Sequence, residues 1–350
     1  MKDINSPEIV LVSATDDGYA MPLAVTVKSA LERLAGGWRV RLFVLDGGLR
    51  PASREMLVNS WRDFPIDVHW LRPKLEELGD LMISEHVNVV TYLRLLMPRL
   101  LPEHVQRAIY LDADMLVLRS LSELWQADLR EVACRAVQDV AAPYIDSEIA
   151  LPQIERCRPH LAAVKPIRNY REMGLSPTGA YFNGGLMLAD IDHWRRADLS
   201  AKMLACLRTH HEHVLWWDQY ALNAELAGNW RPLDPRWNQG SHIYCYQDWQ
   251  QSPFDQATFE QLKNDPWIVH FTSPSKPWHA ASTHPYRHEF RRVLRSTAWS
   301  DYTLLEVAPA QPQVVELSWW KTKKQGFRTL RRAAKKRFQS LLGLQRKKAA

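Results

Sequence analysis

The chain has 350 residues and a formal net charge of +6, with 46% hydrophobic and 24% charged residues, which is ordinary for a soluble globular protein. A chain of this length can bury a sizeable core without disulfide or metal staples. Its sequence excludes a membrane-spanning helix, because no apolar run reaches about 18 residues. We expect no signal peptide, since residues 1–12 contain acidic residues and no long apolar stretch.

Four cysteines occur, and none forms a C-x-x-C pair. This spacing argues against a zinc ribbon and against thioredoxin-like chemistry. Reduced and mostly buried thiols are typical of a cytoplasmic protein, so we expect that compartment. The four positions are Cys134, Cys157, Cys206 and Cys245.

The first 111 residues alternate short apolar runs with segments of helical spacing. Strands are predicted at 8–13, 40–45, 66–71 and 108–111, and helices at 22–34, 51–61 and 91–101. This alternation predicts an α/β fold, with a mainly parallel sheet that carries helices on both faces. Sheets of this kind bind ligands beyond the carboxyl ends of their strands.

The second half of the chain is less regular. A strand is predicted at 181–189, helices at 192–209 and 215–226, and a late strand at 267–271. Residues 139–178 are rich in proline, arginine and polar side chains, and we interpret them as an excursion or lid. The predicted organisation is therefore a catalytic domain at 1–280, a helical C-terminal extension at 281–318 and a basic tail at 319–350.

Two carboxylates, Asp112 and Asp114, stand where the apolar run 109–111 ends. In an extended chain, side chains two residues apart point the same way and can face one cation. Carboxylate oxygens suit Mg²⁺ or Mn²⁺, which can bridge phosphates. A solvated surface loop is the simpler interpretation of such a pair. A phosphatase with Asp112 as its nucleophile is a rival, but such enzymes usually carry this motif on their first strand.

Four further blocks accompany the acidic motif, at residues 14–19, 91–98, 181–188 and 217–223, and a fifth follows at 270–279. In this order the blocks resemble glycosyltransferase family 8, which includes bacterial lipopolysaccharide galactosyl- and glucosyltransferases and glycogenin. The similarity covers roughly residues 8–279. The resemblance implies a nucleotide-sugar transferase fold of the GT-A type with helical C-terminal additions.

The first two blocks are implied to bind the nucleotide sugar. Ala14, Asp16 and Tyr19 belong to the loop that holds uridine in the family, and the carboxylate matching Asp16 reads the uracil edge. Arg94, in a block that resembles the family's Y-x-R-x-x-x-P helix, is implied to reach the sugar or the diphosphate. The plain structural alternatives are a helix cap for Asp16 and a buried ion-pair partner for Arg94.

The third and fourth blocks are implied to surround the donor sugar. Gly184 and Gly185 let the backbone approach a ligand closely, and Asn183 offers a donor and an acceptor to hydroxyl groups. Asp218 is implied to bind sugar hydroxyls, and Gln219 to lie near the reactive face of the anomeric carbon. A bulge in a strand and a helix start with a favourable anion are the plain structural alternatives.

The fifth block resembles the family's H-x-x-G-x-x-K-P motif. His270 is implied to be the third protein ligand of the metal, beside Asp112 and Asp114. Lys276 is implied to neutralise the diphosphate. Ser273 stands where the family usually has glycine, and its hydroxyl is expected to replace that backbone contact.

The resemblance implies a retaining, Mn²⁺- or Mg²⁺-dependent transfer of glucose or galactose from the UDP-sugar to a glycan or lipid-linked acceptor, such as lipopolysaccharide or another surface polysaccharide. Two other classes stay open. A metal-dependent phosphohydrolase needs the carboxylates without the uridine loop, and a non-catalytic sugar-binding module needs only aromatic side chains and Asn183.

The tail is the last signal. Residues 321–350 hold twelve Lys or Arg and no Asp or Glu, so the rest of the chain carries −6. Apolar residues recur there at steps of three and four, which predicts a basic amphipathic helix suited to an anionic membrane surface. We expect a peripheral enzyme at the inner face of the plasma membrane, and no nucleic-acid partner. A disordered tail is the alternative.

Overall fold

The computed structural model describes residues 6–74, 78, 89–129 and 131–306. The chain divides into two units, Met1–Pro309 and Ala310–Ala350, and the described residues all belong to the first. The predicted basic tail at 319–350 and residues 307–318 of the predicted extension at 281–318 lie outside the described residues. Within the described ranges, no helix combines the length and the apolar character that crossing a bilayer requires.

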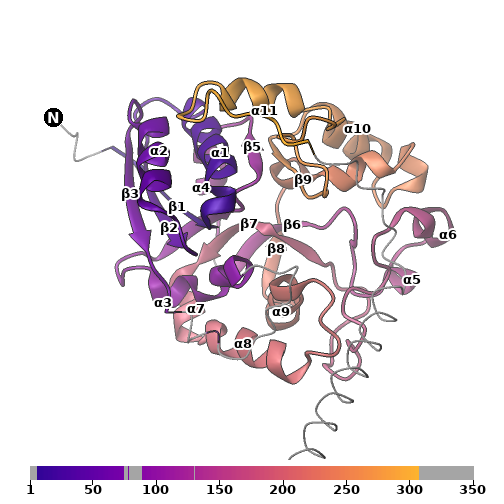
Figure 1. The fold of residues 1–350 in the computed structure, drawn as a ribbon. Coiled ribbons are helices and arrows are strands. Elements are labelled where there is room, and N and C mark those ends of the chain that lie inside the picture. The colour runs from indigo at the N-terminus through magenta and orange to yellow at the C-terminus, as the bar shows by residue number, and fades with distance from the viewer. Residues whose placement is uncertain (1–5, 75–77, 79–88, 130, 307–350) are drawn as a thin grey trace, which may run out of the picture. The chain divides into compact units, whose positions relative to one another are not determined.

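The centre of the protein is a seven-stranded sheet with the order β3-β2-β1-β4-β7-β6-β8 (Figure 1). All neighbouring strands run parallel except β7, which is antiparallel to β4 and β6. The predicted mainly parallel sheet is therefore confirmed. Its strands are β1 Glu8–Thr15, β2 Arg39–Asp46, β3 Ile66–Leu71, β4 Arg107–Leu111, β6 Cys134–Gln138, β7 Phe182–Asp190 and β8 Trp230–Pro232.

Helices cover both faces of this sheet, because its inner strands are apolar on both sides. In β1, Ile9 and Leu11 join one hydrophobic cluster, and Val10 and Val12 join another. The first cluster includes residues of α1 Ala20–Glu32, α2 Pro51–Trp61 and α4 Leu121–Trp125. The second includes residues of α3 Met97–Leu100, α7 Ile191–Arg196, α8 Leu199–Thr209 and α9 Trp217–Glu225. Figure 1 shows these two groups of helices on opposite sides of β1 and β2.

A second, three-stranded sheet has the order β5-β10-β9. β5 Met115–Val117 continues the chain directly after Asp114, and β10 Ile268–His270 is antiparallel to it. β9 Gln239–Gly240 runs parallel to β10. This small sheet therefore brings the late block of the chain to the acidic motif. Two helices near the C-terminal end of the described chain are α10 Gln256–Asn264 and α11 Arg287–Leu294.

Two predicted helices differ from the structure. The helix predicted at 91–101 is a 3₁₀ helix, η3 Val89–Leu96, followed by the single turn of α3. Pro98 explains the change, because it has no N–H for the hydrogen bond to residue 94 that a continuous α-helix would need, whereas proline is tolerated in the first turn of α3. The helix predicted at 192–209 is divided into α7 and α8 at Asp198, whose φ of 45° is left-handed.

The segment 139–178 contains short helices and reaches into the core. Ile145, Ile167 and Tyr170 are buried in the cluster that also holds Phe182 of β7. Its predicted role as a lid stays a prediction. The remaining short elements are α5 Ser147–Ala150, α6 Ile154–Cys157, and the 3₁₀ helices η1 Asp17–Tyr19, η4 Arg158–His160, η5 Pro235–Asn238, η6 Ser241–Cys245 and η7 Trp249–Gln251.

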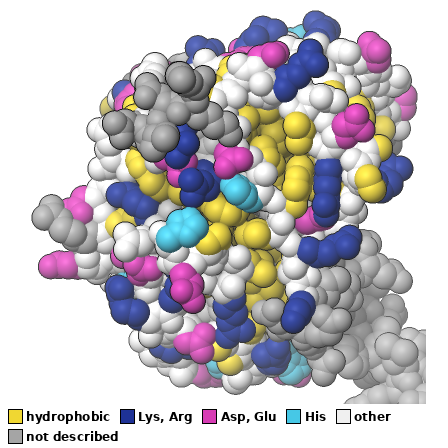
Figure 2. Space-filling model, turned by 90° about the vertical axis from the view of Figure 1, so that its left-hand side faces the viewer, with side chains coloured by type: hydrophobic (Ala, Val, Ile, Leu, Met, Phe, Trp, Pro, Cys, Tyr) yellow, Lys and Arg dark blue, Asp and Glu magenta, His cyan; other side chains and the backbone are white. Residues whose placement is uncertain are grey.

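Strand β3 is at one end of the strand order. It carries two exposed polar side chains, His69 and Asp67, whose Nε2 and Oδ2 atoms lie 3.0 Å apart. Charged side chains on an outer strand oppose edge-to-edge association with other chains. Figure 2, which views the molecule from the side of β3, shows acidic and basic side chains scattered around a band of apolar ones.

Candidate active site

The acidic motif lies at the carboxyl end of β4, where helix α1 holds its backbone. Thr26 Oγ1 donates a hydrogen bond of 2.7 Å to the Ala113 carbonyl. The same oxygen accepts one of 3.0 Å from the Met115 N–H. Thr26 is fully buried, so these contacts fix the turn between β4 and β5. Asp112 and Asp114 therefore stand on a rigid support at the edge of the sheet where parallel α/β folds bind ligands.

The second sheet brings His270 to these carboxylates. His270 is paired with Met115 in the β10–β5 register. Its Nε2 lies 3.3 Å from Asp114 Oδ1 and 3.6 Å from Asp112 Oδ2. One ligand atom from each of the three residues lies within 4.8 Å of the others. The three residues predicted to bind metal therefore form one cluster.

Several properties of this cluster fit a divalent cation. Two carboxylates and one imidazole are ligands that Mn²⁺ and Mg²⁺ accept. Asp114 and His270 are buried, so they are shielded from bulk water. Gly185 borders the cluster, and a Cβ atom there would lie 2.8 Å from Asp112 Oδ2, which is too close. The residues present therefore fit the predicted metal. The same ligand atoms suit both Mn²⁺ and Mg²⁺.

Lys276 and Ser273 come from the loop after β10. Lys276 Nζ donates to Asp114 Oδ2 at 2.7 Å. Burial opposes ionisation of Asp114, but the charge of Lys276 holds the pKa of Asp114 well below its ordinary value. Ser273 Oγ donates to the Ser275 carbonyl at 2.9 Å, which shapes the loop. Lys276 thus stands beside the cluster where a bound diphosphate is expected.

Arg94 is a buried ion-pair partner of two acidic residues. Its Nη1 lies 3.1 Å from Asp112 Oδ1, and its Nε lies 2.7 Å from Asp218 Oδ2. It also donates to the Gly184 carbonyl at 2.6 Å. Burial would lower the pKa of Arg94, but Asp112 and Asp218 raise it above its ordinary value. The ion-pair interpretation is therefore confirmed, and a contact with the donor stays a prediction.

Asp218 lies in the first turn of helix α9 and is 2% exposed. Burial raises its pKa to about 6, against the opposing charge of Arg94 and with a further upward contribution from Asp112. Taking a carboxylate out of water is costly unless it is paired, and Arg94 supplies the pairing. Asp218 is thereby held next to the metal cluster through a shared arginine.

Gln219 and Asn183 are oriented by one acidic residue, Asp139. Asp139 Oδ2 accepts hydrogen bonds from Gln219 Nε2 and Asn183 Nδ2, each at 3.0 Å. Gln219 Oε1 in turn accepts from the Gly184 N–H at 3.1 Å, and Asn183 Oδ1 accepts from the Gly185 N–H at 3.0 Å. The third and fourth blocks of the sequence therefore form a single network against the acidic motif.

The predicted uridine loop follows β1 on the same side of the sheet. Asp16 Oδ1 accepts from the Tyr19 N–H at 3.0 Å, so Asp16 caps η1. Ala14 is buried, whereas Tyr19 is 40% exposed and its ring meets Trp278 edge to face, with centroids 5.9 Å apart. Burial raises the pKa of Tyr19, and the nearby charge of Lys276 opposes that rise. This loop therefore adjoins the metal cluster.

Several functional residues were missed from the sequence. Asp139 follows the carboxyl end of β6, and the rule that led to Asp112 could have found it. Tyr110 donates to Asp112 Oδ1 at 3.0 Å, but it lies inside an apolar strand and had no visible signal. Asn238 Oδ1 lies 3.0 Å from His270 Nδ1, and nothing in its local sequence marked it.

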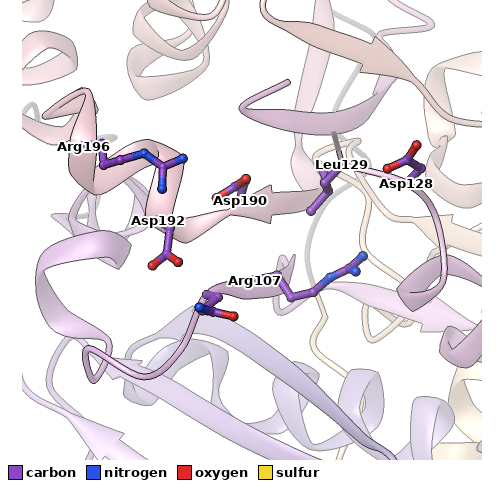
Figure 3. Close-up of a pocket in the computed structure, with 7 residues that line it drawn as sticks. Arg107, Asp128, Leu129, Asp190, Asp192 and Arg196 are labelled. Carbon is purple, nitrogen blue, oxygen red and sulfur yellow. The ribbon is translucent and has the colours of Figure 1, made fainter. Parts of the chain in front are cut away.

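A different hollow lies at the opposite ends of the same strands. It is lined by Gln106, Arg107, Asp128, Leu129, Asp190, Asp192 and Arg196 (Figure 3). Polar side chains of this hollow hold the protein's own backbone: Arg107 donates a hydrogen bond to the Trp125 carbonyl at 2.7 Å. Asp190 accepts from the His193 N–H at 2.7 Å and caps α7. This hollow is therefore no rival to the acidic cluster.

Comparison with known proteins agrees with this geometry. Residues 10–282 match the family model described as glycosyl transferase family 8. The chain belongs to this family. The enzyme class predicted from the sequence, a family 8 glycosyltransferase, is confirmed. Among relatives, General stress protein A of Bacillus subtilis is 30% identical over 83% of this chain and 94% of its own length.

Other family 8 relatives are longer than the region they share with this chain. The lipopolysaccharide 1,3-galactosyltransferase of Salmonella typhimurium is 25% identical over 66% of this chain, which spans 61% of that protein. The galactosyltransferase LgtC, solved with donor and acceptor sugar analogues, superimposes with a TM-score of 0.67 at 23% identity, covering 86% of this chain and 98% of LgtC. The structural likeness confirms the GT-A fold.

Proposed function

We propose that this family 8 enzyme is a retaining, metal-dependent hexosyltransferase that moves glucose or galactose from its UDP-sugar to a glycan or lipid-linked acceptor. The observation that carries the proposal is the convergence of Asp112, Asp114 and His270, with Lys276 beside them. Relatives named lipopolysaccharide 1,3-galactosyltransferase and lipopolysaccharide 1,2-glucosyltransferase support a hexose and an acceptor in lipopolysaccharide or another surface polysaccharide.

In this proposal Asp112, Asp114 and His270 hold Mn²⁺ or Mg²⁺. When bound, the ion acts as a Lewis acid towards the diphosphate. Lys276 adds a second positive charge on the same side, since its Nζ already lies 2.7 Å from Asp114. Ser273 lies three residues before Lys276 on the loop that would face the phosphates. The Lys276 ammonium would stabilise the negative charge that develops on the departing UDP.

The remaining predicted residues are assigned to the nucleoside and the sugar. Ala14, Asp16 and Tyr19 would line the uridine pocket after β1. Gly184 and Gly185, which have no side chains, would let the backbone approach the hexose closely. Asn183 and Arg94, already oriented by their partners, would border it.

Asp218 and Gln219 would stand at the reactive carbon. The bond between the anomeric carbon and the β-phosphate oxygen breaks, and its electron pair leaves with UDP. The oxygen of an acceptor hydroxyl bonds to that carbon, and its proton passes to the departing β-phosphate oxygen. Gln219 supplies a fixed amide there, because both ends of its side chain are hydrogen-bonded to Asp139 and Gly184.

The experiment is a screen of sugar nucleotides for UDP release, with and without Mn²⁺ and with and without oligosaccharide acceptors. We expect UDP-glucose or UDP-galactose to be used and a chelator to stop the reaction. Full activity in the chelator would contradict the metal site. Phosphate release from simple phosphomonoesters would favour a phosphohydrolase, and sugar binding without UDP release would favour a binding module.

We further propose that residues 319–350 hold the enzyme on the cytoplasmic face of an anionic membrane. The twelve Lys and Arg of residues 321–350 support this, since each contributes up to about 1 kcal/mol near an anionic leaflet. The full-length protein should sediment with anionic liposomes and not with neutral ones. Removal of residues 321–350 should abolish sedimentation and leave UDP release intact. Equal sedimentation of both forms at low salt would refute the anchor.

A further inference from the structure

The metal-ligating imidazole of His270 lies between two competing sets of acceptors. Its Nε2 faces the Asp112 and Asp114 carboxylates, 3.6 and 3.3 Å away. Its Nδ1 faces Asn238 Oδ1, 3.0 Å away. A neutral imidazole has only one N–H. If that proton were on Nε2, the N–H would point at the carboxylates, and Nε2 would have no lone pair with which to bind a cation.

Asn238 is positioned to determine which ring nitrogen of His270 carries the proton. It belongs to η5 and is 3% exposed. Its amide has one acceptor end and one donor end: Oδ1 meets His270, and Nδ2 donates to Asn183 Oδ1 at 3.0 Å. Because Nδ2 is engaged by an acceptor, the oxygen must face His270, and only a protonated Nδ1 can satisfy that oxygen.

The direction of the whole hydrogen-bond chain is set by two groups that have fixed roles. The Gly185 backbone N–H can only donate, and it donates to Asn183 Oδ1 at 3.0 Å. Asp139 accepts from Asn183 Nδ2 at 3.0 Å and from the Ala141 N–H at 2.8 Å. Asn183 therefore cannot turn its amide around, and Asn238 cannot do so either.

We propose that Asn238 is the positioning residue that keeps the His270 proton on Nδ1 and so leaves Nε2 free for the metal, while it couples this ligand to the sugar-binding residue Asn183. Outer partners of metal-ligating histidines typically change metal affinity by about 10- to 100-fold when they are removed. The inference rests on the proposed metal site, and it assigns to Asn238 a role that no motif in the sequence had indicated.

Two substitutions separate the contact of Asn238 with His270 from its contact with Asn183. Asn238→Leu removes both ends of the amide at similar volume. Asn238→Asp keeps an acceptor for His270 but places a second oxygen against Asn183 Oδ1. The metal function should therefore survive in N238D, whereas the hydrogen bond to Asn183 Oδ1 should be lost in both variants.

A matched control is available at Asn229. Its Nδ2 lies 3.1 Å from His193 Nε2, and its Oδ1 accepts from the Ala133 N–H at 3.2 Å. It is thus another amide between a histidine and a protein donor, away from the acidic cluster. Asn229→Leu should change thermal stability in the same manner as N238L without changing metal binding.

The experiment titrates Mn²⁺ in the presence of UDP and follows the free ion by electron paramagnetic resonance. N238L should bind Mn²⁺ about 10- to 100-fold more weakly than the wild type. N238D and N229L should stay within about threefold. The ¹⁵N shifts of the His270 ring in the metal-free protein should report an Nδ1–H tautomer in the wild type and N238D, and an Nε2–H tautomer in N238L. Donor kinetics of N238D should show a raised KM at saturating Mn²⁺.

Wild-type Mn²⁺ affinity in N238L, alongside lost affinity in His270→Ala, would overturn the role of Asn238 and leave the metal site standing. Equal loss in N238D and N238L would also overturn it, because an acceptor alone would then be insufficient. Unchanged affinity in His270→Ala would instead refute the proposed metal site itself.

Discussion

Strand β10 separates two unlike environments at its carboxyl end. His270 points to the acidic cluster, where Asp114 and Arg94 are buried, Lys276 is half-buried, and each is paired with an opposite charge. The next residue, Phe271, packs in a buried apolar cluster that also contains Phe290. Buried ion pairs contribute little net stability because desolvation offsets their attraction, whereas buried apolar area is favourable. The first region is therefore arranged for chemistry and the second for stability.

The largest effect is expected in the acidic cluster. Asp114→Asn should lower kcat/KM about 10³-fold or more, because it removes a charge that holds the metal near the leaving diphosphate. The free energy of unfolding should fall by about 3 kcal/mol, because Lys276 loses its ion-pair partner, but the protein should stay folded under assay conditions. Activity assays with urea unfolding of the same sample would check this. If the variant loses activity only because it unfolds, the acidic cluster serves stability as the apolar cluster does, and the contrast between the two regions is wrong.

The converse effect is expected in the apolar cluster. Phe290→Ala should lower the free energy of unfolding by about 3 kcal/mol or more, because it deletes a fully buried ring. The kcat/KM value per folded molecule should stay within about twofold of the wild type. Denaturant titration and kinetics at low temperature would test both. A large loss of kcat/KM in fully folded protein would show that the two regions are coupled.

A pH effect should also come from the apolar cluster. Burial lowers the pKa of His284 to about 4, aided by the charge of Arg287, and its Nε2 has no hydrogen-bond partner among the described residues. Because this pKa lies below the unfolded value of about 6.5, the stabilisation is complete above pH 6.5 and is lost as pH falls towards 4. The loss at pH 5 should be about 2 kcal/mol.

The control for this prediction is His284→Gln. Glutamine does not titrate in this range, and its side-chain oxygen can still accept from the Tyr286 N–H, which lies 3.2 Å from His284 Nδ1 in the wild type. Unfolding curves between pH 7 and 5 should be flatter in this variant than in the wild type. Identical curves would assign the acid sensitivity to other groups.

The smallest effect is expected at the outer margin of the site. Asp16→Ala should raise the KM for the UDP-sugar about tenfold, which is about 1.4 kcal/mol, and leave kcat nearly unchanged. The reason is that uridine lies away from the bond that breaks, so its contacts stabilise the ground state and the transition state equally. Initial-rate kinetics would measure this. A collapse of kcat at unchanged KM would place Asp16 in the chemistry.

Local pattern was sufficient for much of the fold. The apolar runs of β1 to β4 and the spacing of α1 and α2 were visible because a strand buried on both faces has a continuous apolar sequence. The antiparallel direction of β7 was not visible, since its apolar run reads the same in either direction. The replacement of a helix by η3 and α3 depended on Pro98, whose effect is local and could have been used.

The chain itself determined which side chains are available for the chemistry: Asp112 and Asp114 at a strand end, and His270 with Lys276 at a fixed spacing. Only the tertiary structure decided what surrounds them. Residue 238 meets residue 270 because β9 and β10 run side by side, and Asp139 meets Gln219 across 80 residues of chain. Such partners have no sequence period, because a hydrogen bond between distant segments is set by how the strands pair rather than by their order along the chain.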